Sequence, residues 1–301
     1  MSLPILSPDI QRIAQEAKAD PIRVFTNLAH LIDEDLLRAA FWRTRKDGAP
    51  GVDGVTGRRY EQNLDEDLRD LHRRLKEREY HAQPVRRVYI EKEGGKERAL
   101  GVPAFEDKIV QRAVAMLLEP IYEQDFHPSS YGFRPGKSAH QALHHLREEG
   151  MQGWLNWIVD ADIQGFFDQL DRGVLRDLLH RRVKDGGIDR LIGKWLNAGV
   201  LEAGELLHPE RGTPQGGVLS PLLANVYLHY VLDEWFERDV RPRLKGRALL
   251  IRYADDFIIG CELEEDARRL MEVLPKRMGK YGLSLHPEKS RLVRFHRMLK
   301  D

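Results

Sequence analysis

The sequence predicts an α+β fold on three observations. Segments in which apolar residues recur at helical spacing are interleaved with short segments rich in β-branched residues, and the interleaving follows no fixed period. The sequence contains no internal repeat and no low-complexity tract. Apolar residues make up 42% of the 301 residues, which is enough for a core in two domains or in one domain with two lobes.

The first half of the chain is predicted to be mainly helical. Apolar residues recur at helical spacing over residues 8–19, 21–45 and 60–80, and a Gly-rich turn segment at 46–57 separates the last two. Residues 85–103 are predicted to form a β-hairpin around the sequence EGGKE. A further helix over 105–123 is expected to stop near Pro120.

The second half alternates strands and helices. A helix is predicted from Ser138, a strand over 156–163 and a helical stretch over 173–201. Ser220 and Pro221 are suited to the start of a helix that continues to residue 236. A β-hairpin over 249–261, a helix over 264–281 and a turn with a β segment over 282–295 complete the prediction.

Composition excludes several classes of protein. Lys and Arg number 48 and so do Asp and Glu, so net charge gives no reason to expect a nucleic-acid or membrane partner, and any basic surface must be local. Cys261 is the only cysteine, which excludes an intramolecular disulfide and a Cys-rich zinc site. Without a signal-peptide pattern or an apolar run of roughly 18 residues, we expect a soluble cytoplasmic protein.

Aspartates interrupt two of the predicted strands. Asp255 and Asp256 lie between apolar runs in LLIRYADDFIIGC, and Asp160 and Asp162 share one face of IVDADI. A carboxylate in a central strand needs a cation or a solvated cleft, and hard oxygen ligands favour Mg²⁺ or Mn²⁺ over zinc. Either motif alone is as compatible with a structural role, in a turn or at a strand end, as with a functional one. Together the two motifs indicate two-metal phosphoryl transfer.

Longer blocks around these aspartates resemble a known family. DADIQGFFD, GTPQGGVLSPLLANVYLH and RYADDFIIG, in this order, are similar to the palm motifs of reverse transcriptases, above all those of group II intron-encoded proteins and their bacterial relatives. Upstream, GAPGVDGVT, EGGKERALGVPAFEDKIVQRAV and SSYGFRPGKSAHQAL fit the finger and early palm blocks of that family. The resemblance extends from about Gly48 to Ser290.

The resemblance implies a right-hand polymerase fold, with an antiparallel palm sheet backed by helices. It implies a helical N-terminal extension over 1–45, fingers over 46–135 and about 172–212, and a palm over 136–171 and 213–301. Thumb, DNA-binding and endonuclease domains are expected to be absent.

The implied activity is RNA-directed DNA synthesis, a nucleotidyl transfer that uses two Mg²⁺ ions, for which Mn²⁺ could substitute. The implied partners are an RNA template such as group II intron RNA, a DNA primer and deoxynucleoside triphosphates (dNTPs), in the service of retrohoming and intron splicing. Alternatives are an RNA-binding maturase module, a two-metal nuclease, and a domesticated relative used in CRISPR spacer acquisition, diversity generation or defence. The finger helices could also support a homodimer.

By resemblance, Asp162 and Asp255 are the principal metal ligands, the Ile163 carbonyl completes one coordination sphere, and Asp256 supports the metal or the primer end. The residues implied in dNTP binding are Lys92 and Arg98 at the triphosphate, Phe167 as the barrier to a 2′-hydroxyl, and Gln215 at the nucleotide or template. The residues implied in template or primer contacts are Tyr131, Arg134, Gly216, Tyr253 and Lys289. The structural alternatives are solvated basic side chains, core packing for Phe167 and a plain loop at Gln215.

Overall fold

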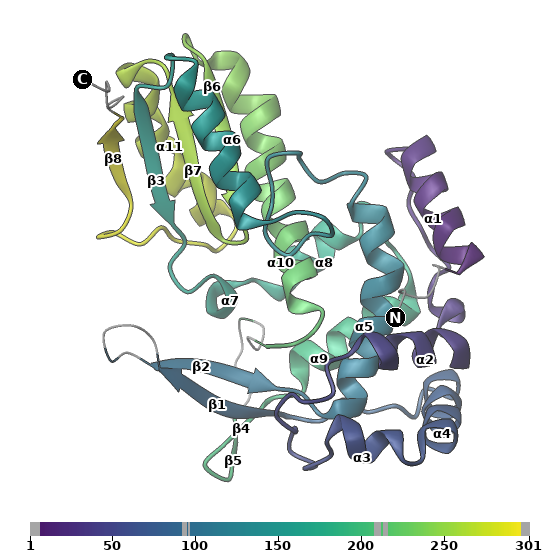
Figure 1. Ribbon diagram of the computed structural model, residues 1–301. Helices are drawn as coiled ribbons and strands as arrows, with labels where there is room; N and C mark the ends of the chain where they lie inside the picture. Colours follow the sequence, from purple (N-terminus) through teal and green to yellow (C-terminus); the bar gives the residue numbers. More distant parts are fainter. Residues whose placement is uncertain (1–6, 92–94, 96, 208–211, 213–215, 296–301) are drawn as a thin grey trace. The chain divides into compact units, whose positions relative to one another are not determined.

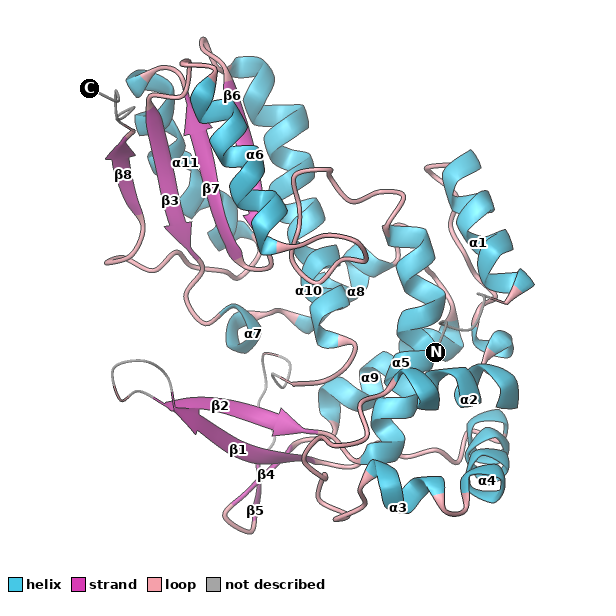
Figure 2. Cartoon of the chain, viewed as in Figure 1, coloured by secondary structure: helices cyan, strands magenta, loops and turns pink. Residues whose placement is uncertain are grey.

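The structure is a computed structural model that describes residues 7–91, 95, 97–207, 212 and 216–295 (Figure 1). The chain forms two compact units. Unit 1 combines Met1–Asp125 with Leu179–Ser220, and unit 2 combines Phe126–Leu178 with Pro221–Asp301. The predicted mixture of helices and strands is confirmed (Figure 2). The division into extension, fingers and palm stays a prediction, because packing alone does not assign those subdomains.

The first helix of unit 1 forms as predicted, but the segment that follows it does not. Helix α1 (Pro8–Ala19) is capped by the Ser7 side chain, which accepts a hydrogen bond from the Ile10 amide. The predicted helix over 21–45 is wrong in its first half, where only the 3₁₀ turn η1 (Ala29–Leu31) precedes α2 (Glu34–Arg43).

Contacts made far away in the sequence explain that difference. The Phe25 amide donates to the Arg182 carbonyl at 2.7 Å, and the Asp185 carboxylate accepts from the Leu28 and Ala29 amides at 2.6 and 3.1 Å. These bonds occupy backbone groups that an α-helix would need for itself.

Four more helices belong wholly to unit 1: α3 (Gly57–Glu61), α4 (Leu64–Lys76), α5 (Phe105–Tyr122) and α9 (Gly186–Asn197). Helix α5 ends near Pro120, as predicted, and includes two residues beyond it, Ile121 and Tyr122, which are both completely buried. Their burial outweighs the hydrogen bond that proline cannot donate.

The sheet of unit 1 has the strand order β2-β1-β4-β5. Its strands are β1 (Val85–Glu91), β2 (Glu97–Val102), β4 (Val200–Glu202) and β5 (Glu205–Leu207). Strands β1 and β2 form the predicted hairpin. The helical stretch predicted over 173–201 is instead split into α8 (Arg172–Leu179), α9 and the start of β4.

The sheet of unit 2 is antiparallel throughout, with the strand order β6-β7-β3-β8. Its strands are β3 (Trp157–Asp162), β6 (Ala248–Tyr253), β7 (Asp256–Cys261) and β8 (Arg291–Arg294). One face is apolar and buried, with Val159 and Ala161 of β3 beside Phe257 and Ile259 of β7. Because side chains alternate along a strand, Asp160 and Asp162 occupy the opposite face.

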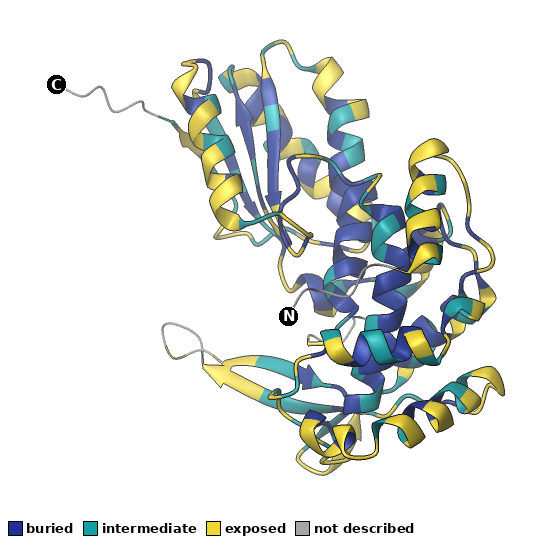
Figure 3. Cartoon of the chain, turned by 45° about the vertical axis from the view of Figure 1, so that its right-hand side comes forward, coloured by how far each residue is buried: buried dark blue, intermediate teal, exposed yellow. Residues whose placement is uncertain are grey.

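Helices cover this sheet. Helix α11 (Glu264–Lys280) packs against β3, β7 and β8. Helix α6 (Ala139–Met151) begins after Ser138, where a helix was predicted to start, and packs against β6. Helix α10 (Ser220–Leu228) continues into the π-helical segments η2 (His229–Asp233) and η3 (Phe236–Val240) and the 3₁₀ turn η4 (Arg241–Arg243). The short helix α7 (Phe166–Gln169) follows β3. Figure 3 shows the buried residues of unit 2 along its strands and the helix faces turned toward them. Within the described part of the chain, no helix is long and apolar enough to cross a membrane.

Candidate active site

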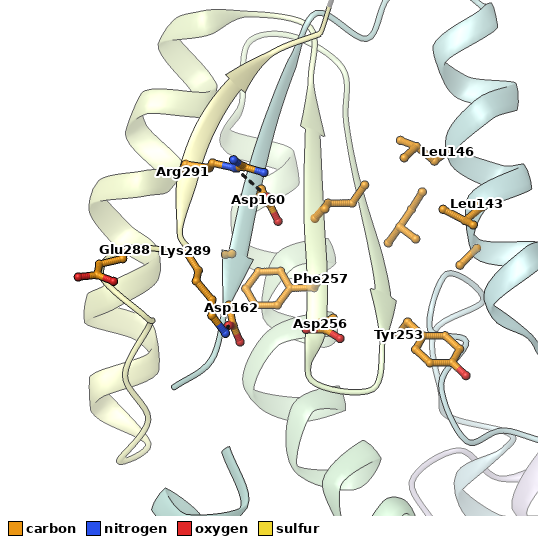
Figure 4. A pocket seen from close by; sticks show the side chains of 14 residues that line it. Leu143, Leu146, Asp160, Asp162, Tyr253, Asp256, Phe257, Glu288, Lys289 and Arg291 are labelled. Atoms are coloured by element: carbon orange, nitrogen blue, oxygen red, sulfur yellow. Dashed lines mark hydrogen bonds and ion pairs between the residues drawn. The ribbon is translucent and has the colours of Figure 1, made fainter. Parts of the chain in front are cut away.

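The strands of unit 2 bring the predicted carboxylates to one end of the sheet. Asp162, the last residue of β3, lies directly opposite Asp256, the first residue of β7, and Asp256 in turn lies opposite Tyr253 of β6. Asp255 lies with Ala254 in the two-residue turn that joins β6 to β7. Figure 4 shows the side chains of Asp162 and Asp256 at the same end of the sheet.

These carboxylates repel one another. Burial, followed by the negative charges of Asp255 and Asp162, raises the pKa of Asp256 above its ordinary value. The positive charge of Lys289 acts in the opposite direction. The cluster therefore has the electrostatic character of a cation site.

The loop before β8 contacts both the side chain and the backbone of Asp162. Lys289 Nζ lies 2.6 Å from Asp162 Oδ2, and this pairing raises the pKa of Lys289. The Asp162 carbonyl accepts a hydrogen bond from the His286 amide at 2.7 Å, and the Asp162 amide donates to Ser290 Oγ at 3.4 Å. The backbone of Asp162 is thus held on both sides while its carboxylate faces an ammonium group.

A cavity of about 570 Å³ lies on this face of the sheet (Figure 4). Its polar lining includes Asp160, Asp162, Asp256, Glu288, Lys289 and Arg291, and its apolar lining includes Leu143 and Leu146 of α6. Asp160, for which no role was predicted, pairs with Arg291 at 3.2 Å. Asp255 does not line the cavity.

A buried network holds the turn that carries Asp255. Arg252 and Asp233 have side chains that are 0% and 1% exposed, and two parallel hydrogen bonds of 2.8 and 2.6 Å join them. Arg252 Nη1 also donates to Asn225 Oδ1 at 2.9 Å and to the Ala254 carbonyl at 2.8 Å. Ala254 has φ of 59°, a left-handed conformation that is unfavourable for alanine. This network was not predicted from the sequence, where its visible sign is an arginine inside an apolar strand.

A second loop is joined to the same turn. The Tyr131 amide donates to the Arg252 carbonyl at 2.8 Å, and the Arg252 amide donates to the Ser129 carbonyl at 3.0 Å. Asn225 Nδ2 donates to the Gly132 carbonyl at 2.8 Å. A Cβ atom on Gly132 would lie 2.1 Å from the Ala254 nitrogen, so only glycine fits at this position.

Tyr131 and Arg134, the residues of this loop that were predicted to contact the template, both have partners within the protein. Tyr131 is 8% exposed in a cluster with Ala142 and Ile251, and its hydroxyl lies 3.0 Å from His145 Nδ1. Arg134 Nη1 donates to the carbonyls of two residues in its own loop, His127 and Ser130, at 2.7 Å each. These contacts position both side chains, and their contacts with a template stay a prediction.

The predicted residues around Phe167 are largely buried. Gly165, with φ of 52°, precedes α7, whose residues Phe166 and Phe167 are both buried with ring centroids 5.2 Å apart. Ile163 is buried and forms an isolated bridge with Leu285.

Two of the predicted nucleotide or template residues that the structure describes, Arg98 and Gly216, belong to unit 1. Arg98 is exposed on β2, opposite Ile90 of β1. Gly216 has φ of 116°, and a Cβ atom there would lie 2.6 Å from the Gly101 carbonyl oxygen. Glycine at position 216 therefore allows the backbone to approach strand β2 closely. Lys92 and Gln215 lie outside the described residues.

The donor set fits Mg²⁺. No three His, Cys, Asp or Glu side chains within the described ranges form a ready metal cluster. Magnesium usually binds one or two carboxylates together with waters and substrate phosphates, so Asp162 and its neighbouring aspartates suffice. The Asp162 carboxylate is paired with Lys289.

Paired aspartates on adjacent antiparallel strands lie here beside a lysine and an open cavity, an arrangement that suits metal-dependent nucleotidyl transfer. Comparison with known proteins then identifies the family. The chain belongs to the reverse transcriptase (RNA-dependent DNA polymerase) family, which it matches over residues 90–299.

Several relatives are encoded in introns. The group II intron-encoded protein LtrA of Lactococcus lactis is 34% identical over 97% of this chain and 50% of its own length. Protein YkfC of Escherichia coli is 35% identical over 85% of this chain and 75% of its own. A 91 kDa protein in the cob intron of Schizosaccharomyces pombe is 41% identical over 54% of this chain and 20% of its own. The chain thus spans about half the length of LtrA.

Proposed function

We propose that this chain is an RNA-directed DNA polymerase of the group II intron type, which extends a DNA primer with dNTPs on an RNA template. The observation that carries the proposal is the cross-strand pair of Asp162 and Asp256 in a chain of the reverse transcriptase family. In this proposal the sheet of unit 2 is the polymerase palm, and the β1–β2 hairpin belongs to the fingers. The intron origin of LtrA favours a role in intron mobility.

Asp162 and Asp255 would hold two Mg²⁺ ions, for which Mn²⁺ could substitute, with the Ile163 carbonyl as a further ligand. When bound, the ions lower the pKa of the primer 3′-hydroxyl and stabilise charge on the α-phosphate. The chain fixes the carboxylates in place, and Asp256 helps to position the primer end. The repulsion that raises the pKa of Asp256 is relieved when positive charge binds beside it.

The remaining residues would bind the substrates. Arg98 and Lys92 would contact the triphosphate, since arginine suits bidentate phosphate contacts and lysine supplies a mobile charge. Phe167 would exclude a 2′-hydroxyl, and Gln215 would touch the nucleotide or template. Lys289 would move from Asp162 to a phosphate oxygen once a metal cation neutralises that carboxylate.

Primer extension on an RNA template with dNTPs and Mg²⁺ tests the proposal. Asp162→Asn and Asp255→Ala should each abolish extension and leave the melting temperature close to that of the wild type. Asp239→Asn is the matched control, because it removes an exposed carboxylate of unit 2 that lies outside the cavity. Substantial extension by purified Asp255→Ala protein would refute the assignment. Cleavage of labelled RNA with Mg²⁺ but without nucleotides would point to the nuclease alternative.

A basic cavity in unit 1 favours RNA binding as a second function, of the kind a maturase needs. The cavity measures about 630 Å³, and its lining includes His30, His72, Lys76, Arg78, Arg190 and Lys194, together with Asp33. Clustered cations of this kind are the usual footprint of a nucleic-acid backbone.

The test separates this function from catalysis. Lys76→Glu with Arg190→Glu should weaken RNA binding and flatten its salt dependence, whereas Asp255→Ala should leave binding intact. Arg69→Glu, on α4 but outside the cavity, is the control. Equal losses in the double variant and the control would refute a role for the cavity.

A further inference from the structure

Phe133 is an exposed aromatic residue in a strained backbone conformation. Its side chain is 61% exposed and its φ is 57°, in the left-handed region that favours glycine and asparagine. Burial of the ring cannot be the reason for this strain, because the ring faces solvent. Strain at an exposed side chain is more often retained where that side chain has a function.

The surrounding structure fixes the position of Phe133. Gly132 packs against the Ala254 backbone and accepts a hydrogen bond from Asn225 at 2.8 Å. On the other side, Arg134 is buried and bonded to two carbonyls of its own loop. The residues on both sides of Phe133 are therefore anchored, one of them to the turn that carries Asp255.

The ring of Phe133 lies beside Tyr253. Their centroids are 6.5 Å apart with 36° between the ring planes, and Tyr253 is itself 38% exposed. Tyr253 lines the cavity that contains Asp162 and Asp256, at the same end of the sheet (Figure 4). Two accessible aromatic rings thus lie next to the candidate metal carboxylates.

We propose that Phe133 is a nucleobase-stacking residue that acts with Tyr253 at the reacting end of the primer–template duplex. This inference rests on the proposed function and adds a specific nucleic-acid contact to it. Aromatic side chains bind bases of any sequence through their faces, and a ring held in place loses little entropy on binding. The base could belong to the primer terminus or to the template strand opposite it, and both sources share this chemistry.

The variants separate stacking from folding. Phe133→Ala should weaken primer–template binding about 5- to 150-fold, the range expected for loss of one stacked base, and leave the KM for dNTP unchanged. Phe133→Trp should retain binding. Phe133→Asn should bind as weakly as Phe133→Ala but raise the melting temperature by about 2–4 °C, because asparagine tolerates the left-handed conformation.

Two controls match these changes. Ala203→Gly relieves a similar positive φ, of 50°, in unit 1 and should raise the melting temperature without affecting duplex binding. Met151→Ala removes a side chain of unit 2 that is also 61% exposed and should leave duplex binding unchanged.

The experiment uses 2-aminopurine as the probe base, placed either at the primer 3′ end or in the template opposite it. Phe133-dependent quenching in one strand supports the inference and identifies the base. Wild-type binding by Phe133→Ala, or quenching that is independent of Phe133 in both strands, overturns it. If the wild-type protein quenches the probe through Phe133 but never extends a primer, the stacking inference stands and the proposed polymerase function fails.

Discussion

Removal of either partner from the Arg252–Asp233 pair should destabilise unit 2 strongly. Both side chains are almost completely buried. Arg252→Met therefore leaves the Asp233 carboxylate without its counter-charge, and Asp233→Leu leaves the Arg252 guanidinium without its counter-charge. The loss of one partner from a buried pair costs about 3–5 kcal/mol, because the remaining charge is neither paired nor hydrated. Arg252→Met also removes the donor to Asn225 and to the Ala254 carbonyl, which places it at the upper end of that range.

The double variant distinguishes pairing from simple loss of packing. Arg252→Met with Asp233→Leu leaves no buried charge, so its cost should be at least 2 kcal/mol below the sum of the two single costs. The matched control is Arg268–Glu264, an exposed pair 2.6 Å apart on α11, whose removal should cost only about 0.3–0.5 kcal/mol.

These costs are measured locally by urea unfolding that is monitored through hydrogen exchange at residues 248–261. A local probe is required because the two units need not unfold together. Arg252→Lys keeps the charge but loses the two parallel bonds, so under conditions where it is folded it should extend primers more slowly than the wild type. Single-variant costs below 1 kcal/mol, or strict additivity in the double variant, would refute the reasoning.

Three further predictions concern single positions. Gly132→Ala should sharply reduce primer extension, since its Cβ would overlap the Ala254 backbone, and hydrogen exchange at residues 254–256 should rise. Burial lowers the pKa of His229 from 6.5 to about 4. As pH falls, the unfolded chain therefore binds a proton on this histidine before the folded chain does. The free energy of unfolding should fall by about 3 kcal/mol as pH drops from 6.5 to 4. His229→Phe should remove that loss in urea unfolding at several pH values, and an unchanged acid slope would contradict it. Phe167→Val should admit ribonucleotides in primer extension, whereas unchanged sugar selectivity would count against its role as the barrier.

Local signals in the sequence were sufficient for the elements that depend on neighbouring residues. The helical spacing over 8–19, the hairpin around EGGKE and the alternation in IVDADI all depend on residues close together in the sequence, and each element formed as predicted. The segment after α1 failed because its amides bond to the Asp185 carboxylate, 156 and 157 residues away in the chain. A periodic pattern contains no information about such distant partners.

The same limit applied to the candidate site. Resemblance located the aspartates, but the support around them joins Arg252 to Asp233 and Asn225, which are 19 and 27 residues distant. The exposure and positive φ of Phe133 were not predicted, because they arise from tertiary contacts of Gly132 and Arg134. The resemblance also names Asp255 as the leading ligand, while the structure places Asp256 opposite Asp162 and beside the cavity.

The unfavourable features of unit 2 are concentrated at one end of its sheet. Two non-glycine residues have left-handed backbones there: Ala254, next to Asp255, and Phe133, whose ring lies beside Tyr253. Burial and the repulsion of its neighbours raise the pKa of Asp256 at the same end of the sheet. Each feature costs stability, which the apolar face and the buried Arg252–Asp233 pair of the same unit supply. A turn chosen only for stability would use glycine at position 254 and would separate the charges. The arrangement becomes intelligible when cations and a nucleobase are its partners, because positive charge relieves the repulsion and a stacked base covers the exposed rings.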